Sequence, residues 1–175
     1  MRAIEETEQA GGFAELRIDA LNPSLRSDPA AIASLVRGRA AILTHRRVSD
    51  GGLSETPEAE RISLLAEAAI RSRVWCDIEM DAADAIHRFG LDASRVIVSH
   101  HDTKSTPDDL PKIVDRLLAV PAAVAKIATT AVLTTDLFAL VEQLERARSL
   151  GRPLVAIAMG EKGAATRILG PAWGA

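Results

Sequence analysis

Aromatic side chains are scarce in this chain of 175 residues, where they make up 3% of the composition and tyrosine is missing. The core therefore has to be built from alanine, leucine, isoleucine and valine, within an apolar fraction of 47%. Such a core suits a parallel β-sheet wrapped by helices, because strands of that kind are buried on both faces. The length predicts one globular domain spanning residues 1–175.

Cysteine is nearly missing as well. The single Cys76 excludes an internal disulfide bond, and cysteine and histidine nowhere have the spacing of a zinc site. We therefore expect no metal, and interpret Cys76 as a small buried side chain. No GxGxxG or GxxxxGK[ST] stands at a strand-to-helix turn, which argues against dinucleotide or nucleotide binding.

The chain lacks a large excess of either charge. It has 21 Lys and Arg residues and 24 Asp and Glu residues, which gives a net charge of -3. This balance favours a small metabolite over nucleic acid or a membrane surface as partner. No apolar run approaches the roughly 20 residues that span a bilayer, and the charged N-terminus is unlike a signal peptide. A cytoplasmic protein is expected.

What the sequence does contain is an alternation of short runs rich in Val and Ile with longer amphipathic segments. Strands are predicted over residues 13–19, 40–46, 74–80, 95–102, 122–129 and 153–160. Helices are predicted near residues 29–37, 57–72, 82–89, 107–119 and 134–149. Asp28-Pro29 and Thr56-Pro57 each have the pattern of an N-cap followed by the first helical residue.

Polar residues recur near the C-terminal ends of these strands. They are Glu15, Arg17, Asp19, Arg46, Asp77, Glu79, His100, His101, Asp102, Lys126 and Met159-Gly160 leading toward Arg167. Serial βα units can close into a TIM barrel or remain an open, doubly wound sheet. A barrel gathers all its strand ends at one mouth, whereas an open sheet concentrates them at one switch point. The pattern favours an α/β fold of the TIM (β/α)8 type.

Lys126 stands inside the apolar run PAAVAKIA. Burial disfavours a charged amine, and a neutral amine attacks carbonyl groups. A lysine that extends to water from a strand end is the alternative. In the run VIVSHHD, strand alternation sends His100 and His101 to opposite faces, so one of them is expected to enter a site as a general acid or base.

Arginines come from separate segments at Arg17, Arg46 and Arg167. Converging guanidinium groups bind carboxylate or phosphate in a bidentate manner, which favours an anionic substrate. The alternative is that each arginine pairs with a nearby acid, such as Glu15 or Asp50, in a structural network.

Taken together and in order, these segments resemble the type I 3-dehydroquinate dehydratase family. The matching segments are ELRID (15–19), LTHR (43–46) with DGG (50–52), CDIE (76–79), VSHHD (98–102) with TP (106–107), VAKIA (124–128), and AMGEKG (158–163) with TR (166–167). They cover nearly the whole chain. The resemblance implies a lyase of the shikimate pathway that converts 3-dehydroquinate to 3-dehydroshikimate without a metal or an organic cofactor.

The resemblance also implies residue roles. Lys126 matches the lysine that forms a Schiff base with the substrate ketone, and His101 matches the proton shuttle, whereas His100 receives no role. Asp50 matches the acid that partners the histidine. The residues expected to bind substrate are Glu15, Arg17, Arg46, Arg167 and Met159, while Asp77 and Glu79 are expected to brace the mouth of the barrel.

This chain departs from the family pattern in two respects. Asp50 replaces a glutamate, which retracts the carboxylate by roughly an ångström and is expected to weaken its contact with His101. The readable strands correspond to the second through seventh of the family, so the barrel is expected to be incomplete, with the first and last strands missing. We expect a second copy in a homodimer, or terminal residues such as Trp173, to cover the gap. A catalytically weak homologue that binds a metabolite or another protein is the alternative function.

Overall fold

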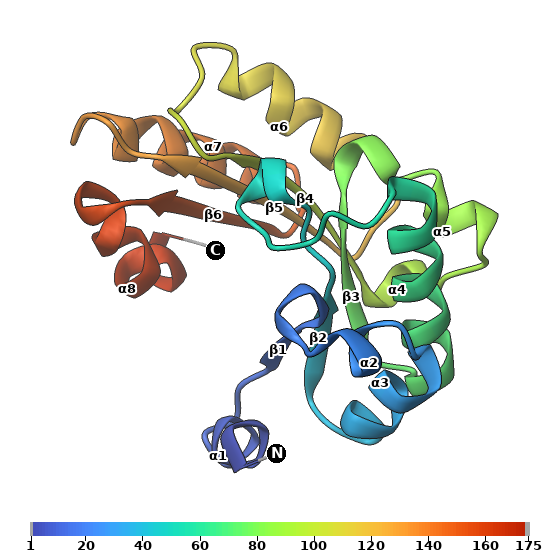
Figure 1. The fold of residues 1–175 in the computed structure, drawn as a ribbon. Helices are drawn as coiled ribbons and strands as arrows, with labels where there is room; N and C mark the ends of the chain where they lie inside the picture. The colour runs from blue at the N-terminus through green and yellow to red at the C-terminus, as the bar shows by residue number, and fades with distance from the viewer. Residues whose placement is uncertain (1, 174–175) are drawn as a thin grey trace. The chain divides into compact units, whose positions relative to one another are not determined.

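The computed structural model describes residues 2–173, and the chain forms two compact units that meet in sequence between Val96 and Ile97. These are the N-terminal unit, residues 2–96, and the C-terminal unit, residues 97–173 (Figure 1). The prediction of a single domain stays a prediction.

In the N-terminal unit, parallel strands lie side by side in sequence order: β1 (Ala14–Arg17), β2 (Ala41–Thr44) and β3 (Trp75–Glu79). The helices of this unit are α1 (Arg2–Gln9), α2 (Pro23–Arg26), α3 (Pro29–Val36), α4 (Glu58–Ser72) and α5 (Ala85–Arg88). Short 3-10 turns follow the strand ends at η1 (Ile18–Ala20), η2 (Val48–Asp50) and η3 (Met80–Ala82), and η4 (Ala93–Arg95) precedes the next strand.

The core of the N-terminal unit lies between the sheet and the helices α3 and α4, which pack against each other. Leu43 and Cys76 are partners in the β2–β3 register and are buried on this side, together with Ile32 and Leu65 from the helices. Burial of each large apolar side chain in this core stabilises the fold by about 1.5–3 kcal/mol. The other face of the sheet is thereby left for polar residues.

The helix starts show one confirmed cap and one correction. The carboxylate of Asp28 accepts hydrogen bonds from the backbone N–H groups of Ala30 and Ala31, with Pro29 as the first helical residue, as predicted. The prediction for Thr56-Pro57 is wrong by one residue. Pro57 has an extended backbone (ψ 140°) and is itself the N-cap, so α4 begins at Glu58.

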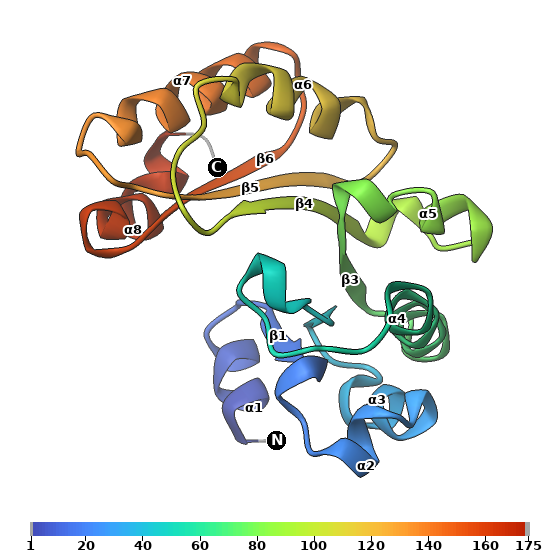
Figure 2. The same ribbon diagram turned by 45° about the horizontal axis from the view of Figure 1, so that its top comes forward.

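Strand β4 (Val96–Asp102) begins with the last residue of the N-terminal unit and continues into the C-terminal unit, where β4, β5 (Val124–Thr130) and β6 (Leu154–Met159) are parallel neighbours in sequence order. The helices are α6 (Leu110–Ala119), α7 (Asp136–Ser149) and α8 (Ala164–Trp173), with a 3-10 turn η5 (Glu161–Gly163) before α8. Helices α6 and α7 cover one face of these strands (Figure 2). Val114, Leu117, Leu140 and Leu144 are buried beneath them.

Each predicted strand is present, with ends that differ from the prediction by up to two residues, and β5 extends one residue further than predicted, to Thr130. The predicted helices are present with later starts or earlier ends. The sequence pattern did not predict α1, α2 or α8. Helix α2 spans one turn, and α8 carries Gly170 and Pro171, residues that ordinarily indicate a helix end. Within residues 2–173, no helix is long and apolar enough to cross a bilayer.

Candidate active site

In the N-terminal unit, the register of the strands places polar side chains on the face that the helices leave uncovered. Arg17 of β1 is level with Thr44 of β2, and Thr44 is level with Asp77 of β3. Glu15 points the same way as Arg17, since it lies two residues earlier on β1. Glu15 is exposed and Arg17 is half-buried. These side chains therefore share one surface near the C-terminal ends of the strands.

Arg17 is held by Asp19 and not by Glu15. Its Nε and Nη2 atoms donate to the two carboxylate oxygens of Asp19 at 3.0 and 2.6 Å. Asp19 is 2% exposed and also accepts from the backbone N–H groups of Arg46 and Leu53. Burial raises the pKa of Asp19, but these hydrogen bonds outweigh it and the pKa lies below its ordinary value. Asp19 thus ties the end of β1 to the segment after β2.

Arg46 is 3% exposed and lies between two acids of β3, Asp77 and Glu79. Its guanidinium donates from Nη1 to Glu79 at 2.9 Å and pairs through Nη2 with Asp77 at 2.9 Å. Burial lowers the pKa of Arg46, but the charges of Asp77 and Glu79 outweigh it, so the pKa lies above its ordinary value. A direct contact of Arg46 with substrate stays a prediction.

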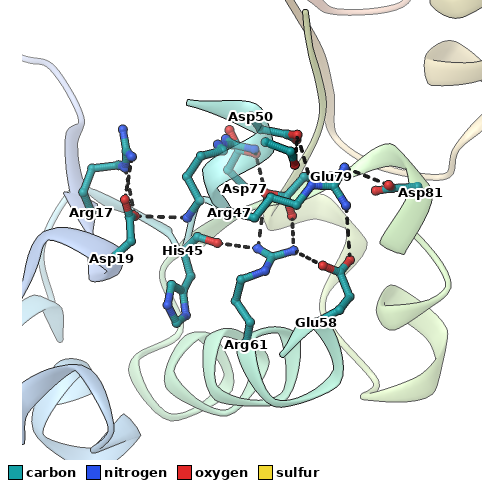
Figure 3. Close-up of polar contacts among 12 residues, drawn as sticks. Arg17, Asp19, His45, Arg47, Asp50, Glu58, Arg61, Asp77, Glu79 and Asp81 are labelled. Atoms are coloured by element: carbon teal, nitrogen blue, oxygen red, sulfur yellow. Dashed lines mark hydrogen bonds and ion pairs between the residues drawn. The ribbon is translucent and has the colours of Figure 1, made fainter. Parts of the chain in front are cut away.

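Arg61 of α4 is a residue that the sequence analysis missed. It is fully buried, and it donates to both oxygens of Glu79, to Glu58 at 3.0 Å and to the backbone carbonyl of His45 (Figure 3). No sequence signal separates it from an ordinary surface arginine of an amphipathic helix. Its Nε atom has no hydrogen-bond partner among the described residues.

His45, next to Arg46, is 1% exposed, and neither of its ring nitrogens has a hydrogen-bond partner among residues 2–173. Burial and the neighbouring Arg61 lower its pKa to about 4. The ring is therefore neutral at pH 7.

Asp50 lies at the end of η2 and is positioned by its own turn. Its carboxylate accepts from Arg47 Nε at 3.0 Å and from Ser49 Oγ at 2.9 Å. The chain then folds back so tightly that a Cβ atom on Gly52 would lie 2.1 Å from the carbonyl oxygen of Arg46. The second glycine of the DGG turn is thus a steric requirement. The pairing of Asp50 with His101 stays a prediction.

In the C-terminal unit, Lys126 is half-buried and lies on the face of β5 opposite α6 and α7. Its partners in the register are Ser99 of β4 and Val155 of β6. His101 lies two residues beyond Ser99 on the same strand and shares that face, whereas His100 is level with the buried Ile127 on the other face. Lys126 and His101 are therefore neighbours on one surface.

The loop after His101 is organised by hydrogen bonds. Asp102 Oδ1 accepts from the backbone N–H groups of Lys104 and Ser105 at 2.8 and 2.9 Å. The hydroxyl of Thr106 lies 2.8 Å from that of Thr129 on β5. These contacts fix the end of β4 relative to β5, and so fix His101 relative to Lys126.

Met159 shares the face of Lys126, since it is the register partner of Thr130. Arg167 lies on α8 and is exposed. The preceding residue, Thr166, ties the start of α8 to β6. Its hydroxyl accepts a hydrogen bond from the backbone N–H of Ala158 at 3.0 Å and donates one to the carbonyl of Gly163 at 2.8 Å. Convergence of Arg167 with the arginines of the N-terminal unit stays a prediction.

Within residues 2–173, no three side chains of His, Cys, Asp or Glu are arranged to hold a metal ion. Glu15, Arg17, Arg46 and Asp50 belong to the N-terminal unit, and His101, Lys126, Met159 and Arg167 to the C-terminal unit.

Comparison with known proteins identifies relatives along the whole chain. The family model for type I 3-dehydroquinase matches residues 1–175. A 3-dehydroquinate dehydratase of Desulfotalea psychrophila is 33% identical over 134 residues, which is 73% of this chain and 59% of that protein. One of Dehalococcoides mccartyi is 33% identical over 168 residues, which is 93% of this chain and 72% of that protein. The matched regions thus span about three-fifths to three-quarters of the relatives' length.

Solved structures resemble the fold. A 3-dehydroquinate dehydratase from Geobacillus kaustophilus aligns with a TM-score of 0.81 at 24% identity, covering 99% of this chain and 74% of that one. One from Enterococcus faecalis aligns with a TM-score of 0.79 at 23% identity, covering 99% of this chain and 80% of that one. This likeness confirms the predicted fold class, an α/β fold of the TIM-barrel type that is incomplete in this chain.

Proposed function

Because the chain belongs to the type I 3-dehydroquinase family, we propose that it dehydrates 3-dehydroquinate to 3-dehydroshikimate through a Schiff base on Lys126. The observation that carries this proposal is the shared face of Lys126 and His101 on adjacent parallel strands. A lysine amine beside a histidine provides a carbonyl nucleophile and a general acid-base group on one surface.

The proposed reaction proceeds in four steps. The Lys126 amine attacks the C3 ketone, and loss of water gives an iminium ion. His101 removes the C2 proton, and the electrons move into the iminium to give an enamine. The enamine expels the C1 hydroxyl, which leaves as water with a proton from His101. Hydrolysis of the resulting iminium releases the product ketone and the free amine.

Substrate binding is proposed for the polar side chains of both units. The exposed Glu15 and the half-buried Arg17 are available to the hydroxyl groups of the ring, and the exposed Arg167 to the carboxylate. Arg46 is proposed to contribute charge from its buried position between Asp77 and Glu79. These groups hold the substrate in the geometry for attack.

Borohydride trapping tests the Schiff base. Reduction of the enzyme in the presence of 3-dehydroquinate is expected to give a stable adduct, which peptide mapping by mass spectrometry places on Lys126. The adduct should be lost in Lys126→Ala and kept in Lys112→Ala, a matched control because Lys112 is an exposed lysine of α6. No adduct at saturating substrate would rule out the Schiff base.

Turnover is measured separately, from the absorbance of the conjugated product. Activity above the Lys126→Ala background is expected and supports the enzyme. A trapped adduct without turnover would mean that the chain binds the substrate but lacks the remaining catalytic groups.

Association into a homodimer is also proposed. The C-terminal unit exposes large apolar side chains, among them Phe138 of α7 (72% exposed) and Ile168 of α8 (80% exposed), and a second copy that covered them would remove apolar surface from water. Sedimentation equilibrium tests it, and a monomer at all concentrations would contradict it. The location in the cytoplasm stays a prediction.

A further inference from the structure

A cavity of about 370 Å³ opens in the N-terminal unit at the amino end of β3, opposite to the end that carries Asp77 and Glu79. It lies where α4 ends and where the chain returns from α5 toward β4. Helix α5 spans only four residues.

The floor of the cavity is apolar. Ala69 of α4, Cys76 of β3 and Val96 of β4 line it, and they are 5%, 2% and 1% exposed. Burial raises the pKa of the Cys76 thiol to about 12, so this side chain is uncharged at pH 7. The half-exposed Ile70 and the buried Val74 complete the apolar lining.

The rim of the cavity is cationic. Arg73 and Arg95 both line it, against one acid, Asp92. Arg95 is held in place, since it donates to the backbone carbonyl of Arg73 and lies 3.6 Å from Asp92. The guanidinium of Arg73 makes no hydrogen bond or ion pair among residues 6–173. The guanidinium of Arg73 therefore lies, without a partner in the described part of the chain, at the rim of an apolar cavity.

The backbone of Arg73 is unusual for an arginine. Its φ of 60° is the only positive value at a non-glycine residue in the part of the chain that the structure describes. Helices that end in this left-handed conformation usually carry glycine there, because any side chain is disfavoured. Glycine would suit this backbone better than arginine, and the arginine places a positive charge beside the cavity.

We infer that this cavity binds a small carboxylate with an apolar body, the carboxylate on Arg73 and Arg95 and the apolar part on Ala69, Cys76 and Val96. The volume is in the range of small-molecule sites, about 300–1,000 Å³, and an apolar lining with a few placed polar groups is the usual composition of such sites. The inference does not depend on the proposed reaction.

Protein-observed NMR with 3-phenylpropionate tests the inference. Titration is expected to shift the backbone amide signals around Arg73, Leu91 and Val96 in a saturable manner. The amide 3-phenylpropanamide lacks the charge and propionate lacks the ring, so both are expected to bind at least about tenfold more weakly. No saturable shift with 3-phenylpropionate, or equal binding of all three probes, would overturn the inference.

Arg73→Gly separates binding from folding. Glycine relieves the left-handed backbone, so the variant is expected to unfold at a temperature no lower than the parent chain, while its affinity for 3-phenylpropionate falls about tenfold or more. The matched control is Arg116→Gln, which removes an exposed arginine of α6 without placing a glycine inside a helix. It should bind as the parent does. Unchanged affinity in Arg73→Gly would overturn the inference.

Ala69→Leu provides a second variant, which extends the floor into the cavity. It is expected to abolish binding of 3-phenylpropionate, and circular dichroism verifies that the helices remain. If Ala69→Leu does not fold, Arg73→Gly alone decides, since that variant relieves strain instead of adding it.

Discussion

Arg61 on α4 donates two hydrogen bonds to the carboxylate of Glu79 on β3, from Nη1 to Oε1 at 3.2 Å and from Nη2 to Oε2 at 2.9 Å. Arg46 donates to the same carboxylate from the strand beside it. Glu79 therefore stands between two buried cations, and the geometry of the predicted substrate-binding Arg46 depends on a helix residue behind it.

Removing Arg61 should be strongly destabilising. Arg61→Met leaves the buried Glu79 with one partner fewer and removes the link to the carbonyl of His45. Breaking a buried pair in this way costs about 3–5 kcal/mol. Urea unfolding followed by circular dichroism measures the loss. Adding Glu79→Gln to Arg61→Met is expected to recover part of it, because the uncompensated charge is then gone.

The matched control lies on the same helix. Arg71 pairs with Glu67 one turn earlier, and both side chains are about half exposed. Arg71→Met is expected to change the unfolding free energy by less than about 0.5 kcal/mol. Equal losses in the Arg61 and Arg71 variants would contradict a special contribution of the buried pair.

His45 should make the protein sensitive to mild acid. Its pKa falls from 6.5 to about 4 on folding, so between these values the unfolded chain binds the proton and the folded chain does not. The contribution to stability is present above pH 6.5 and is lost as the pH falls toward 4, by about 3 kcal/mol. Unfolding free energies measured from pH 7 to pH 4 test this loss.

His45→Phe removes the titrating group and keeps a ring of similar size. The slope of stability against pH in this window should flatten, although the variant can differ in absolute stability. His87→Gln is the control, because His87 is exposed on α5 of the same unit. A parent slope unchanged in His45→Phe would show that other groups carry the acid sensitivity.

The sequence predicted the strands and placed His100 and His101 on opposite faces, because both follow from local alternation. The resemblance to the family, not the alternation, assigned His101 and Lys126 to the site. It did not predict the role of Arg61, since this depends on which helix packs behind which strand. Arg17 pairs with a nearby acid, as the structural alternative expected, and that acid is Asp19, two residues away. The burial of His45 likewise follows from α4 packing against β2, a tertiary contact. The partners of Arg61 and the burial of His45 are set by contacts between segments far apart in the sequence, which the periodicity of the sequence cannot predict.

Asp50 is predicted to be one methylene too short for its role. If it orients His101 as proposed, Asp50→Glu should raise kcat, by up to about a hundredfold for a correction of an ångström. Asp81→Glu is the control, because Asp81 also pairs with Arg47, at 2.7 Å, but lies exposed after β3. It should leave kcat unchanged. A kcat that falls in Asp50→Glu would mean that the turn held by Arg47 and Ser49 already places the shorter carboxylate correctly.

The two adjacent histidines should differ sharply in their effect on catalysis. His101 shares the face of Lys126, and His100 is level with Ile127 on the face toward the helices. His101→Ala is expected to lower kcat by about 10²–10⁴, the usual contribution of a general acid-base group, whereas His100→Ala should change it by less than about threefold. Borohydride trapping adds a second readout. Because Lys126 remains in both variants, His101→Ala should still give an adduct on prolonged incubation with substrate. Loss of the adduct together with kcat would place the main role of His101 in Schiff-base formation, and a larger loss in His100→Ala would overturn the assignment of the proton shuttle.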